Sequence, residues 1–445
     1  MRYKKFLSFT LLAAGMLTLA SCGNAPKEET AGKHNIQLTK VTDYLYETTL
    51  DYDFEIADAQ ALYQKYKPHM GGCSSVSIGN LRGRNLDWVY GTGVEVVVRT
   101  PKTDKRHASL GIASLVNVSE EEANDGQNQE GCEMLPWVTV DGINDAGVCV
   151  NVNVVNYQEL GPWEMKTETE DDDISELFFV RLILDNCAYL TEVVPLMEQY
   201  DPISLGTVDE CHFMVTGPRS PEDSTVTTVI FEQVPYSEGG KNLRRPCCIS
   251  TDEKDIVLVG GNAERFFLSK ADPFIMTNFN LWQFEADKDR KGRLLSATAN
   301  PMGFERYETI EKAAQSALSV VGSKDSLTFY QMQDIMRAVY YTNNYNLSQP
   351  NYWYTEEMKG ILTKEEIINA THQQRNPGGD INNILKGKDN KYFEHIKNLM
   401  VNRKQRDRNA PGNLWETIHT TIYNYKERSL QVNVHEGTIY YDYKL

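Results

Sequence analysis

Residues 73–88 read Cys-Ser-Ser-Val-Ser-Ile-Gly-Asn-Leu-Arg-Gly-Arg-Asn-Leu-Asp-Trp, and Gly71 and Gly72 come directly before them. Gly79-Asn80 is a pair typical of tight turns, and the residues on either side alternate in part. The stretch therefore predicts a β-hairpin in which 73–78 runs out and 83–90 returns. The rest of the chain is organised around this hairpin.

Two residues of the returning strand have the chemistry to assist Cys73. An arginine favours a thiolate over a thiol, and an aspartate can hold an amine as its acceptor, so Arg84 and Asp87 are the candidates. If residues 79–83 form a five-residue turn, Ser75 lies opposite Asp87. Asp87 is then on the same face of the hairpin as Cys73. Arg84 and Asp87 are an odd number of residues apart, so both reach one face only if the strand is bulged or bent close to Arg84.

The peptide bond between Gly72 and Cys73 is predicted to be cut by the protein itself. Glycines have no Cβ, so the backbone can adopt the conformation in which a thiol attacks the carbonyl before it. A cysteine at the new N-terminus supplies nucleophile and base in one residue, because its free α-amine has a pKa of roughly 7.7 to 8 and no histidine is needed. The residues alone leave alternatives open: a buried thiol or half of a disulfide for Cys73, and a surface ion pair for Arg84 and Asp87.

The composition bounds the class of protein. The chain has 445 residues, 41% of them hydrophobic, which allows one large domain or two to three ordinary ones. Its formal net charge of −17 becomes −20 without residues 1–21, which hold three basic side chains and no acidic one. A surface this acidic argues against a nucleic-acid partner.

Residues 1–21 are predicted to be a signal peptide rather than part of the fold. A basic head precedes an apolar run that is short for a membrane span. With Leu19-Ala20-Ser21-Cys22 after it, the segment resembles a bacterial lipoprotein signal, which implies cleavage before Cys22 and lipid attachment to its thiol. An ordinary secretory signal is the alternative. We therefore expect a lipoprotein of the bacterial cell envelope, on the periplasmic face or the cell surface, with residues 22–33 as a flexible tether.

The order of predicted elements indicates an α+β protein. Residues 34–72 carry a strand-like stretch, 41–49, and a helix-like stretch, 54–66, and are predicted to be a pro-segment that packs on the main body and stays bound after cleavage. From residue 73 onward, strands and helices follow in groups, which is typical of large antiparallel sheets covered by helices. Beyond the hairpin, the predicted strands are 94–99, 110–118, 148–155, 213–217, 224–233, 247–251, 256–260, 417–425 and 430–435, and the predicted helices are 174–187, 190–200, 304–318 and 327–340.

Local signals add detail to this order. Asp141-Gly142-Ile143-Asn144-Asp145-Ala146-Gly147 has the residues of a turn leading into strand 148–155. The acidic run 171–173 suits a helix N-terminus, and Ser326 is placed as the N-cap of helix 327–340. Residues 342–413 are predicted to be an insertion within a main domain that spans 73–445.

Eight cysteines are present, and Cys22 and Cys73 already have predicted roles. The other six are irregularly spaced, and no C-x-x-C pair indicates a metal or redox site. An exported protein can form disulfides. We expect mostly buried free thiols, with one pair possible.

The stretches Cys73-Ser-Ser-Val76 and Gly83-Arg-Asn-Leu-Asp-Trp88 resemble the choloylglycine hydrolase or linear amide C–N hydrolase family. Its members include bile salt hydrolases, penicillin V acylases, acid ceramidase and N-acylethanolamine acid amidase, all N-terminal-nucleophile hydrolases. The resemblance implies a four-layer αββα sandwich. It extends over 141–155, 176–187, 261–262, 304–307 and 417–434.

The resemblance also implies roles for the residues of the hairpin. Cys73 matches the nucleophile, with autocleavage between Gly72 and Cys73. Arg84 and Asp87 match the arginine and aspartate of the GRNLDW-type motif.

Three residues outside the hairpin also match family positions. Asn153 lies on the strand where the family keeps an asparagine of the oxyanion or substrate site, with Asn151 on the same face as a rival. Asn262, in Gly-Asn-Ala-Glu, takes the place of the asparagine in the family's Thr-Asn-His-Phe run. Arg306 matches an arginine that the family keeps late in the chain, at the start of a helix.

The implied reaction is hydrolysis of a small N-acyl amide by Cys73, without a metal or cofactor. Residues 34–72 resemble the small subunit of the acid ceramidase and N-acylethanolamine acid amidase branch, which favours a fatty-acyl amide. The alternatives are conjugated bile salt hydrolase or penicillin V acylase-like activity, acyl transfer to an amine, and a non-catalytic ligand-binding lipoprotein.

Overall fold

The structure, a computed structural model, describes residues 34–66, 72–89, 94–115, 129–155, 173–203, 210–252, 264–267, 273–282, 303–340, 415–434 and 439–445. Its described strands form two large sheets and one small one. The ten-stranded sheet runs, from edge to edge, through β1 (Thr39–Lys40), β2 (Leu45–Thr49), β5 (Glu95–Thr100), β6 (Ser109–Ser114), β7 (Thr139–Asn144), β8 (Cys149–Val155), β11 (Glu210–Pro218), β12 (Val226–Glu238), β13 (Lys241–Ser250) and β14 (Glu264–Phe267). The six-stranded sheet runs through β15 (Phe274–Met276), β3 (Gly72–Ile78), β4 (Leu81–Val89), β16 (Trp415–Asn424), β17 (Ser429–Val434) and β18 (Tyr441–Lys444).

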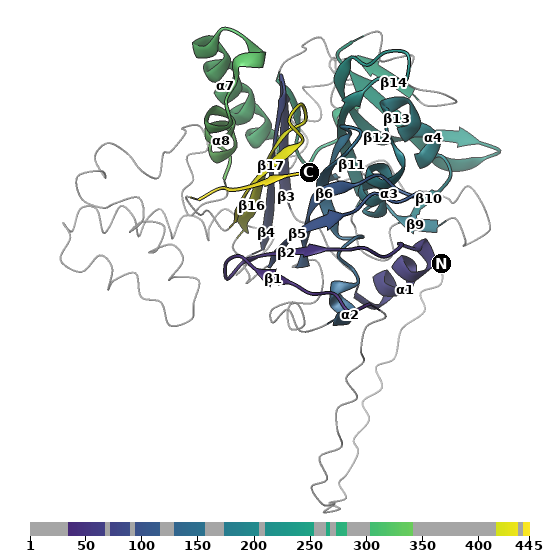
Figure 1. Cartoon of the computed structure of the whole chain (residues 1–445). Coiled ribbons are helices and arrows are strands. Elements are labelled where there is room, and N and C mark those ends of the chain that lie inside the picture. The colour runs from purple at the N-terminus through teal and green to yellow at the C-terminus, as the bar shows by residue number, and fades with distance from the viewer. Residues whose placement is uncertain are drawn as a thin grey trace, which may run out of the picture.

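Helices cover the outer face of each large sheet, so the protein has four layers (Figure 1). α3 (Phe178–Asn186) packs on β7 and β8, with η4 (Leu190–Glu192) and α4 (Val193–Met197) beside it. α7 (Phe304–Val321) and α8 (Phe329–Arg337) pack on β3, β4, β15 and β16, and η7 (Lys324–Ser326) joins them. The short α2 (Gln129–Cys132) and the parallel pair β9 (Asp173–Ser175) and β10 (Asp201–Ile203) complete the described elements, with α1 (Ile56–Tyr66) against β9. The prediction of an α+β fold with αββα layers is confirmed.

The predicted hairpin is present as β3 and β4, but its turn has two residues and not five. Gly79, with φ +54, and Asn80 make the turn, and the pairs run from Ile78↔Leu81 to Gly72↔Asp87. A side chain at Gly79 would meet the carbonyl oxygen of Lys324 at 2.3 Å, so the close approach of η7 also requires glycine there. Ser75 is consequently paired with Arg84, and the predicted Ser75–Asp87 pairing is wrong.

The N-terminal segment is part of the main sheet. β2 pairs with β5 in parallel over five residues, and Leu45 and Leu50 are buried. α1, at the predicted helix 54–66, buries Ala59 and Tyr63 in the same core. The predicted packing of residues 34–66 on the main body is therefore seen.

Some predicted elements need correction. Residues 141–144, expected in a turn, belong to β7, where they are buried and the strand is paired with β6 and β8. Thr328, and not Ser326, caps α8: its side chain accepts from the backbone N–H of Gln331. Asp173 begins a strand, so helix α3 starts later than predicted, and the predicted helix 190–200 is a 3₁₀ turn followed by the short α4.

Other predictions stay untested. The signal peptide with Cys22, strand 256–260 and the insertion 342–413 lie outside the described residues. The seven described cysteines are all buried, as expected, and no disulfide joins any two of them.

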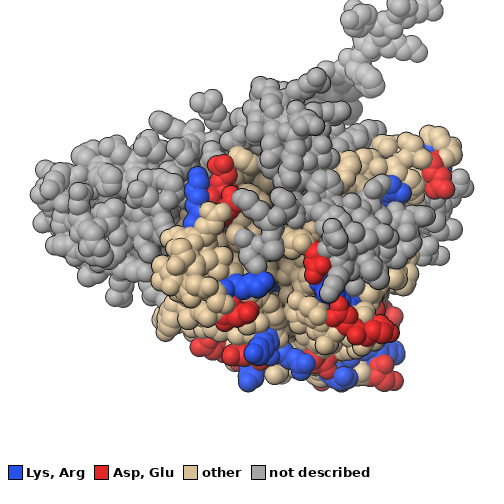
Figure 2. Space-filling view, turned by 90° about the horizontal axis from the view of Figure 1, so that it is seen from above, with Lys and Arg blue, Asp and Glu red and all other residues tan. Residues whose placement is uncertain are grey.

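Acidic and basic side chains are intermixed on the face seen in Figure 2, where red and blue groups lie side by side along the lower edge of the view. Among the helices that the structure describes, none is long and apolar enough to cross a membrane.

Candidate active site

Cys73 lies in β3 with its side chain buried between the two large sheets. Arg84, from β4, donates from Nη2 to Cys73 Sγ at 3.3 Å and to the carbonyl oxygen of Val152 in β8 at 3.2 Å. Arg84 can do this because it pairs with Ser75, which is on the same face of β3 as Cys73. The predicted partnership of Arg84 with the thiol is thus present in the geometry.

The second terminal nitrogen of Arg84 contacts groups from two further strands. Arg84 Nη1 is 3.2 Å from Asp141 Oδ2 and 2.8 Å from His419 Nε2. Asp141 also accepts from the hydroxyls of Thr421 and Tyr423. Burial raises the pKa of Asp141, but His419, Arg84 and Tyr423 outweigh this effect and hold it below its usual value, so the carboxylate is ionised.

Asp87 serves the other side of Cys73, on the opposite face of β4. Its Oδ2 is 3.1 Å from Arg306 Nη1, and its Oδ1 accepts from Thr417 Oγ1 at 2.6 Å. Arg306 Nη1 in turn donates to the carbonyl oxygen of Cys73 and to Ser74 Oγ. No bulge interrupts the described β3–β4 pairing. Arg84 and Asp87 therefore point to opposite faces, one to the thiol and one, through Arg306, to the main chain of Cys73.

Asn278, which sequence reasoning missed, holds the nitrogen of Cys73. Its Oδ1 accepts from Cys73 N at 2.8 Å and also from Arg306 Nη2, and its Nδ2 donates to the carbonyl oxygen of Val154 at 2.7 Å. Two donors on one oxygen fix which way the amide points. In the uncut chain the acceptor of Cys73 N is thus Asn278, whereas Asp87 reaches the main chain of Cys73 through Arg306.

A signal for Asn278 was present in the sequence. Thr277-Asn278-Phe279-Asn280 shares its first two residues with the Thr-Asn-His-Phe run, which was assigned instead to Asn262. Asn262 lies outside the described residues, so its role stays a prediction.

Asn153 is buried in the polar layer between the sheets and braces the segment that carries Asn278. Its Nδ2 donates to the carbonyl oxygens of Met276 and Thr277, at 3.1 and 3.2 Å. Its Oδ1 accepts from Ser75 Oγ at 3.1 Å, and Asn151 Nδ2 donates to the same hydroxyl at 2.8 Å. Both protons of the Asn153 amide are thus engaged in holding main chain next to Cys73.

Burial raises the pKa of the Cys73 thiol, and the positive charges of Arg84 and Arg306 oppose that effect. Burial also raises the pKa of Asp87, to about 6, against the influence of Arg306 and Thr417. At neutral pH Asp87 is therefore ionised and paired with Arg306.

The raised pKa of Asp87 makes the free energy of unfolding depend on pH, and Asp87→Asn should remove this dependence. The folded protein binds the proton of Asp87 more tightly than the unfolded chain, whose pKa is near 3.8, so the free energy of unfolding falls as the pH rises from 4 through 6. Relative to Asp87→Asn, the parent should lose about 2 kcal/mol over this range. Urea unfolding of both proteins, each carrying Cys73→Ala so that the chain stays in one piece, measures the difference. Parallel pH profiles would contradict it.

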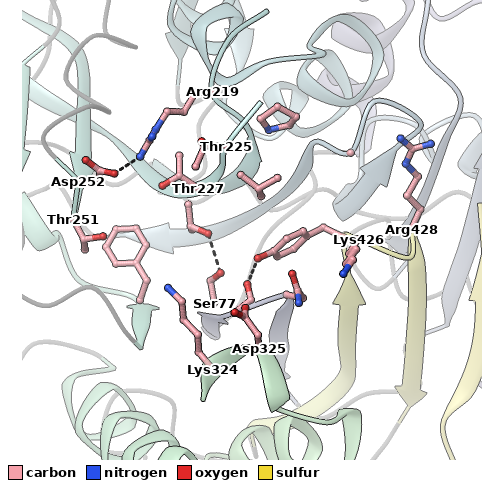
Figure 3. Close-up of a pocket in the computed structure, with 18 of the residues that line it drawn as sticks. Ser77, Arg219, Thr225, Thr227, Thr251, Asp252, Lys324, Asp325, Lys426 and Arg428 are labelled. Atoms are coloured by element: carbon pink, nitrogen blue, oxygen red, sulfur yellow. Dashed lines mark hydrogen bonds and ion pairs between the residues drawn. The ribbon is translucent and has the colours of Figure 1, made fainter. Parts of the chain in front are cut away.

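A separate cavity of about 1000 Å³ lies at the turn end of the hairpin (Figure 3). Ser77, which lines it, is four residues beyond Cys73, roughly 13 Å along the strand. Arg219, paired with Asp252, lies on one side of the cavity and Lys324 on another. None of the residues around Cys73 described above lines this cavity.

Residues 73–229 match the model of the family described as linear amide C-N hydrolases, choloylglycine hydrolase family. A search of curated protein sequences finds no match. Similar solved structures include penicillin V acylase from Agrobacterium tumefaciens, with 13% identity, a TM-score of 0.39, and 84% of this chain and 86% of that chain covered. They also include a variant of the conjugated bile acid hydrolase from Clostridium perfringens, with 12% identity, a TM-score of 0.35, and 84% of this chain and 92% of that chain covered.

The matched residues begin at Cys73 and contain Arg84 and Asp87, the three hairpin positions that the motif predicts. Residues 73–229 are thus similar to the choloylglycine hydrolase family of linear amide C-N hydrolases, whose members hydrolyse carbon–nitrogen bonds in linear amides.

Proposed function

We propose that this protein is a self-processing, lipid-anchored cysteine amidase that hydrolyses an N-acyl amide, such as a fatty-acyl amide, with Cys73 as its N-terminal nucleophile. The observation that carries the proposal is the set of contacts on Cys73: Arg84 on its sulfur, Asn278 on its nitrogen and Arg306 on its carbonyl oxygen. Thiol, future amine and main chain are each held by a separate buried side chain.

Self-processing uses the thiol of Cys73 against its own preceding peptide. Sγ attacks the carbonyl carbon of Gly72, the bond from that carbon to Cys73 N breaks, and the nitrogen takes up a proton to become the α-amine. Water then hydrolyses the thioester, which releases the carboxylate of Gly72 and restores the thiol. Arg84 favours the attacking thiolate, because its positive charge lies 3.3 Å from the sulfur.

Amide hydrolysis repeats this chemistry on the substrate. Sγ attacks the amide carbonyl carbon, and the protonated α-amine of Cys73 gives its proton to the leaving nitrogen as the carbon–nitrogen bond breaks. The α-amine then accepts a proton from the water that hydrolyses the thioester. Asn278 Oδ1 already accepts from this nitrogen, so it can orient the amine in both steps.

The anchor would reach the catalytic body through the N-terminal segment. Lipid on Cys22 and the cysteine at position 73 would lie on different chains after cleavage. β2 would keep them together, since it lies between β1 and β5 in the ten-stranded sheet and carries the buried Leu45. Its pairing with β5 explains how a cut enzyme could stay at the membrane of the bacterial cell envelope.

The fatty-acyl preference is supported by this same segment. Residues 34–66 form two strands and a helix built into the fold, comparable to the small subunit expected for the acid ceramidase and N-acylethanolamine acid amidase branch. Fatty-acyl, ceramide, bile-acid and penicillin V amides offered to the processed protein test the preference. A higher kcat/KM on the bile-acid or penicillin V amide would refute it and leave the amidase proposal intact.

Intact-mass analysis tests the processing. We expect two fragments that meet at Gly72 and Cys73, which co-elute in gel filtration and separate only in denaturant. A mature protein that stays joined across this bond and hydrolyses none of the amides would refute the enzymatic proposal. Fragments that separate without denaturant would refute only the proposed role of β2.

A further inference from the structure

Glu95 and His419 form a buried pair behind Arg84 that the proposed reaction does not use. His419 Nδ1 is 2.6 Å from Glu95 Oε2, and both side chains are fully buried. The other carboxylate oxygen of Glu95 accepts from Ser114 Oγ at 2.6 Å. These residues come from β5, β6 and β16, so both large sheets contribute to the pair.

The arrangement fixes the form of the imidazole. Arg84 keeps its protons and can only donate, so His419 Nε2, 2.8 Å from Arg84 Nη1, must accept. The ring proton is then on Nδ1 and is donated to Glu95. Burial lowers the pKa of His419, but Glu95 and Asp141 outweigh it and raise the pKa above its usual value. Acidification would therefore place a proton on Nε2 and oppose the contact with Arg84.

We propose that Glu95 and His419 are positioning residues that hold the guanidinium of Arg84 against the sulfur of Cys73, an inference that rests on the proposed role of Cys73 as nucleophile. Glu95 fixes the tautomer of His419, and His419 with Asp141 holds Arg84 Nη1. The planar guanidinium then presents Nη2 to Cys73 Sγ at 3.3 Å. Neither Glu95 nor His419 is described in contact with the thiol, so their effect passes through Arg84.

Among the described residues, the charged and titratable groups that face this series of contacts come from six strands. They are Cys73 on β3, Arg82 and Arg84 on β4, Glu95 on β5, Asp141 on β7, Cys149 on β8, and His419 and Tyr423 on β16. Asp141 directly, and Glu95 through His419, thus hold Nη1 of Arg84 and leave Nη2 to the sulfur and to the carbonyl oxygen of Val152.

The test compares Glu95→Ala with Glu95→Gln, which keeps an acceptor for His419 without the charge. Thiolate formation is followed by far-ultraviolet absorbance against pH, with the matching Cys73→Ala protein subtracted, and kcat and KM are measured on a cleaved amide. For Glu95→Ala we expect the titration of Cys73 to move up by about one pH unit, kcat to fall about tenfold and KM to stay within about twofold. Glu95→Gln should stay close to the parent.

A control on the other face of β16 separates positioning from stability. Thr420 is also buried, with its hydroxyl 2.9 Å from Asn85 Oδ1 and 2.7 Å from the hydroxyl of Tyr340, away from the thiol. Thr420→Val should lower the urea midpoint without moving the thiol titration. If Glu95→Ala does not fold, Glu95→Asp, which withdraws the carboxylate by one methylene, should show the same upward titration.

A folded Glu95→Ala protein with the thiol titration and kcat of the parent would overturn the proposal. A Glu95→Gln protein that is as impaired as Glu95→Ala would also overturn it. The negative charge of Glu95, and not its hydrogen bond with His419, would then be responsible for the effect. The thiol titration does not depend on amide turnover. If the parent neither cleaves itself nor hydrolyses amides, yet its thiol titration responds to Glu95, the proposed function fails and the positioning role stands.

Discussion

Cys73→Ala is expected to leave the chain whole across Gly72 and position 73 and to remove amide hydrolysis altogether. The variant lacks the sulfur that attacks, so neither the thioester of self-cleavage nor that of the substrate can form. Loss of a covalent nucleophile lowers kcat by at least about 10⁴-fold. Intact mass and turnover of a fatty-acyl amide measure the two effects. Stability should change little, because alanine removes only one buried sulfur.

Cys73→Ser is the matched variant for this prediction, since it keeps a nucleophilic atom in the same place. Arg84 lies 3.3 Å from the sulfur and favours a thiolate, but a serine hydroxyl ionises far less readily. Cys73→Ser should therefore cleave itself more slowly than the parent and hydrolyse amides at less than about 1% of its rate. A cut between Gly72 and position 73 in Cys73→Ala would show that another protease makes it.

The part of the site that could be predicted from the sequence is the part that lies within one hairpin. Arg84 follows Cys73 by 11 residues, and a turn signal at Gly79-Asn80 joins their strands. The period of two along a strand correctly placed Arg84 and Asp87 on opposite faces. The bulge that would have placed both side chains on one face is absent from the β3–β4 pairing. Arg84 instead contacts the thiol of Cys73, and Asp87 acts through Arg306 on its main chain.

The groups behind Arg84 have no such local signal. Asp141 was assigned to a turn because Asp, Gly and Asn are turn residues, yet in β7 its carboxylate lies between Arg84 and Tyr423. Glu95 and His419 lie 324 residues apart, and only the pairing of their strands in two packed sheets brings them together. Such contacts depend on tertiary register, which composition and periodicity do not specify.

Asn278 differs from these residues, because the short motif Thr277-Asn278 indicated it in the sequence. The family's asparagine was instead assigned to Asn262. Asn278 lies 205 residues after Cys73, in a stretch that had been assigned to neither a strand nor a helix. Its place depends on buried contacts from the ten-stranded sheet. Asn153 holds the carbonyl oxygen of Thr277, and so does His212, whose Nε2 is 2.8 Å from that oxygen while its Nδ1 faces Glu232.

Asn278→Ala is expected to lower amide hydrolysis by about 10²-fold or more, whereas Asn262→Ala, with the same change in size, should stay within a few-fold of the parent. The first variant removes the oxygen that accepts from Cys73 N at 2.8 Å and from Arg306 Nη2, so the α-amine loses its orientation. It also leaves buried donors without an acceptor, which should lower the free energy of unfolding by about 1–3 kcal/mol.

The measurement must separate slow processing from slow turnover. Intact mass gives the cleaved fraction of each variant, and kcat is expressed per cleaved molecule. Asn278→Asp keeps an acceptor oxygen toward Cys73 N and Arg306, so it should retain more activity than Asn278→Ala. The reverse order for positions 262 and 278, with Asn262→Ala inactive and Asn278→Ala normal, would support Asn262 as the match of the family's asparagine. The contact between Asn278 and Cys73 would then be structural, a brace between β15 and β3 that the chemistry does not use.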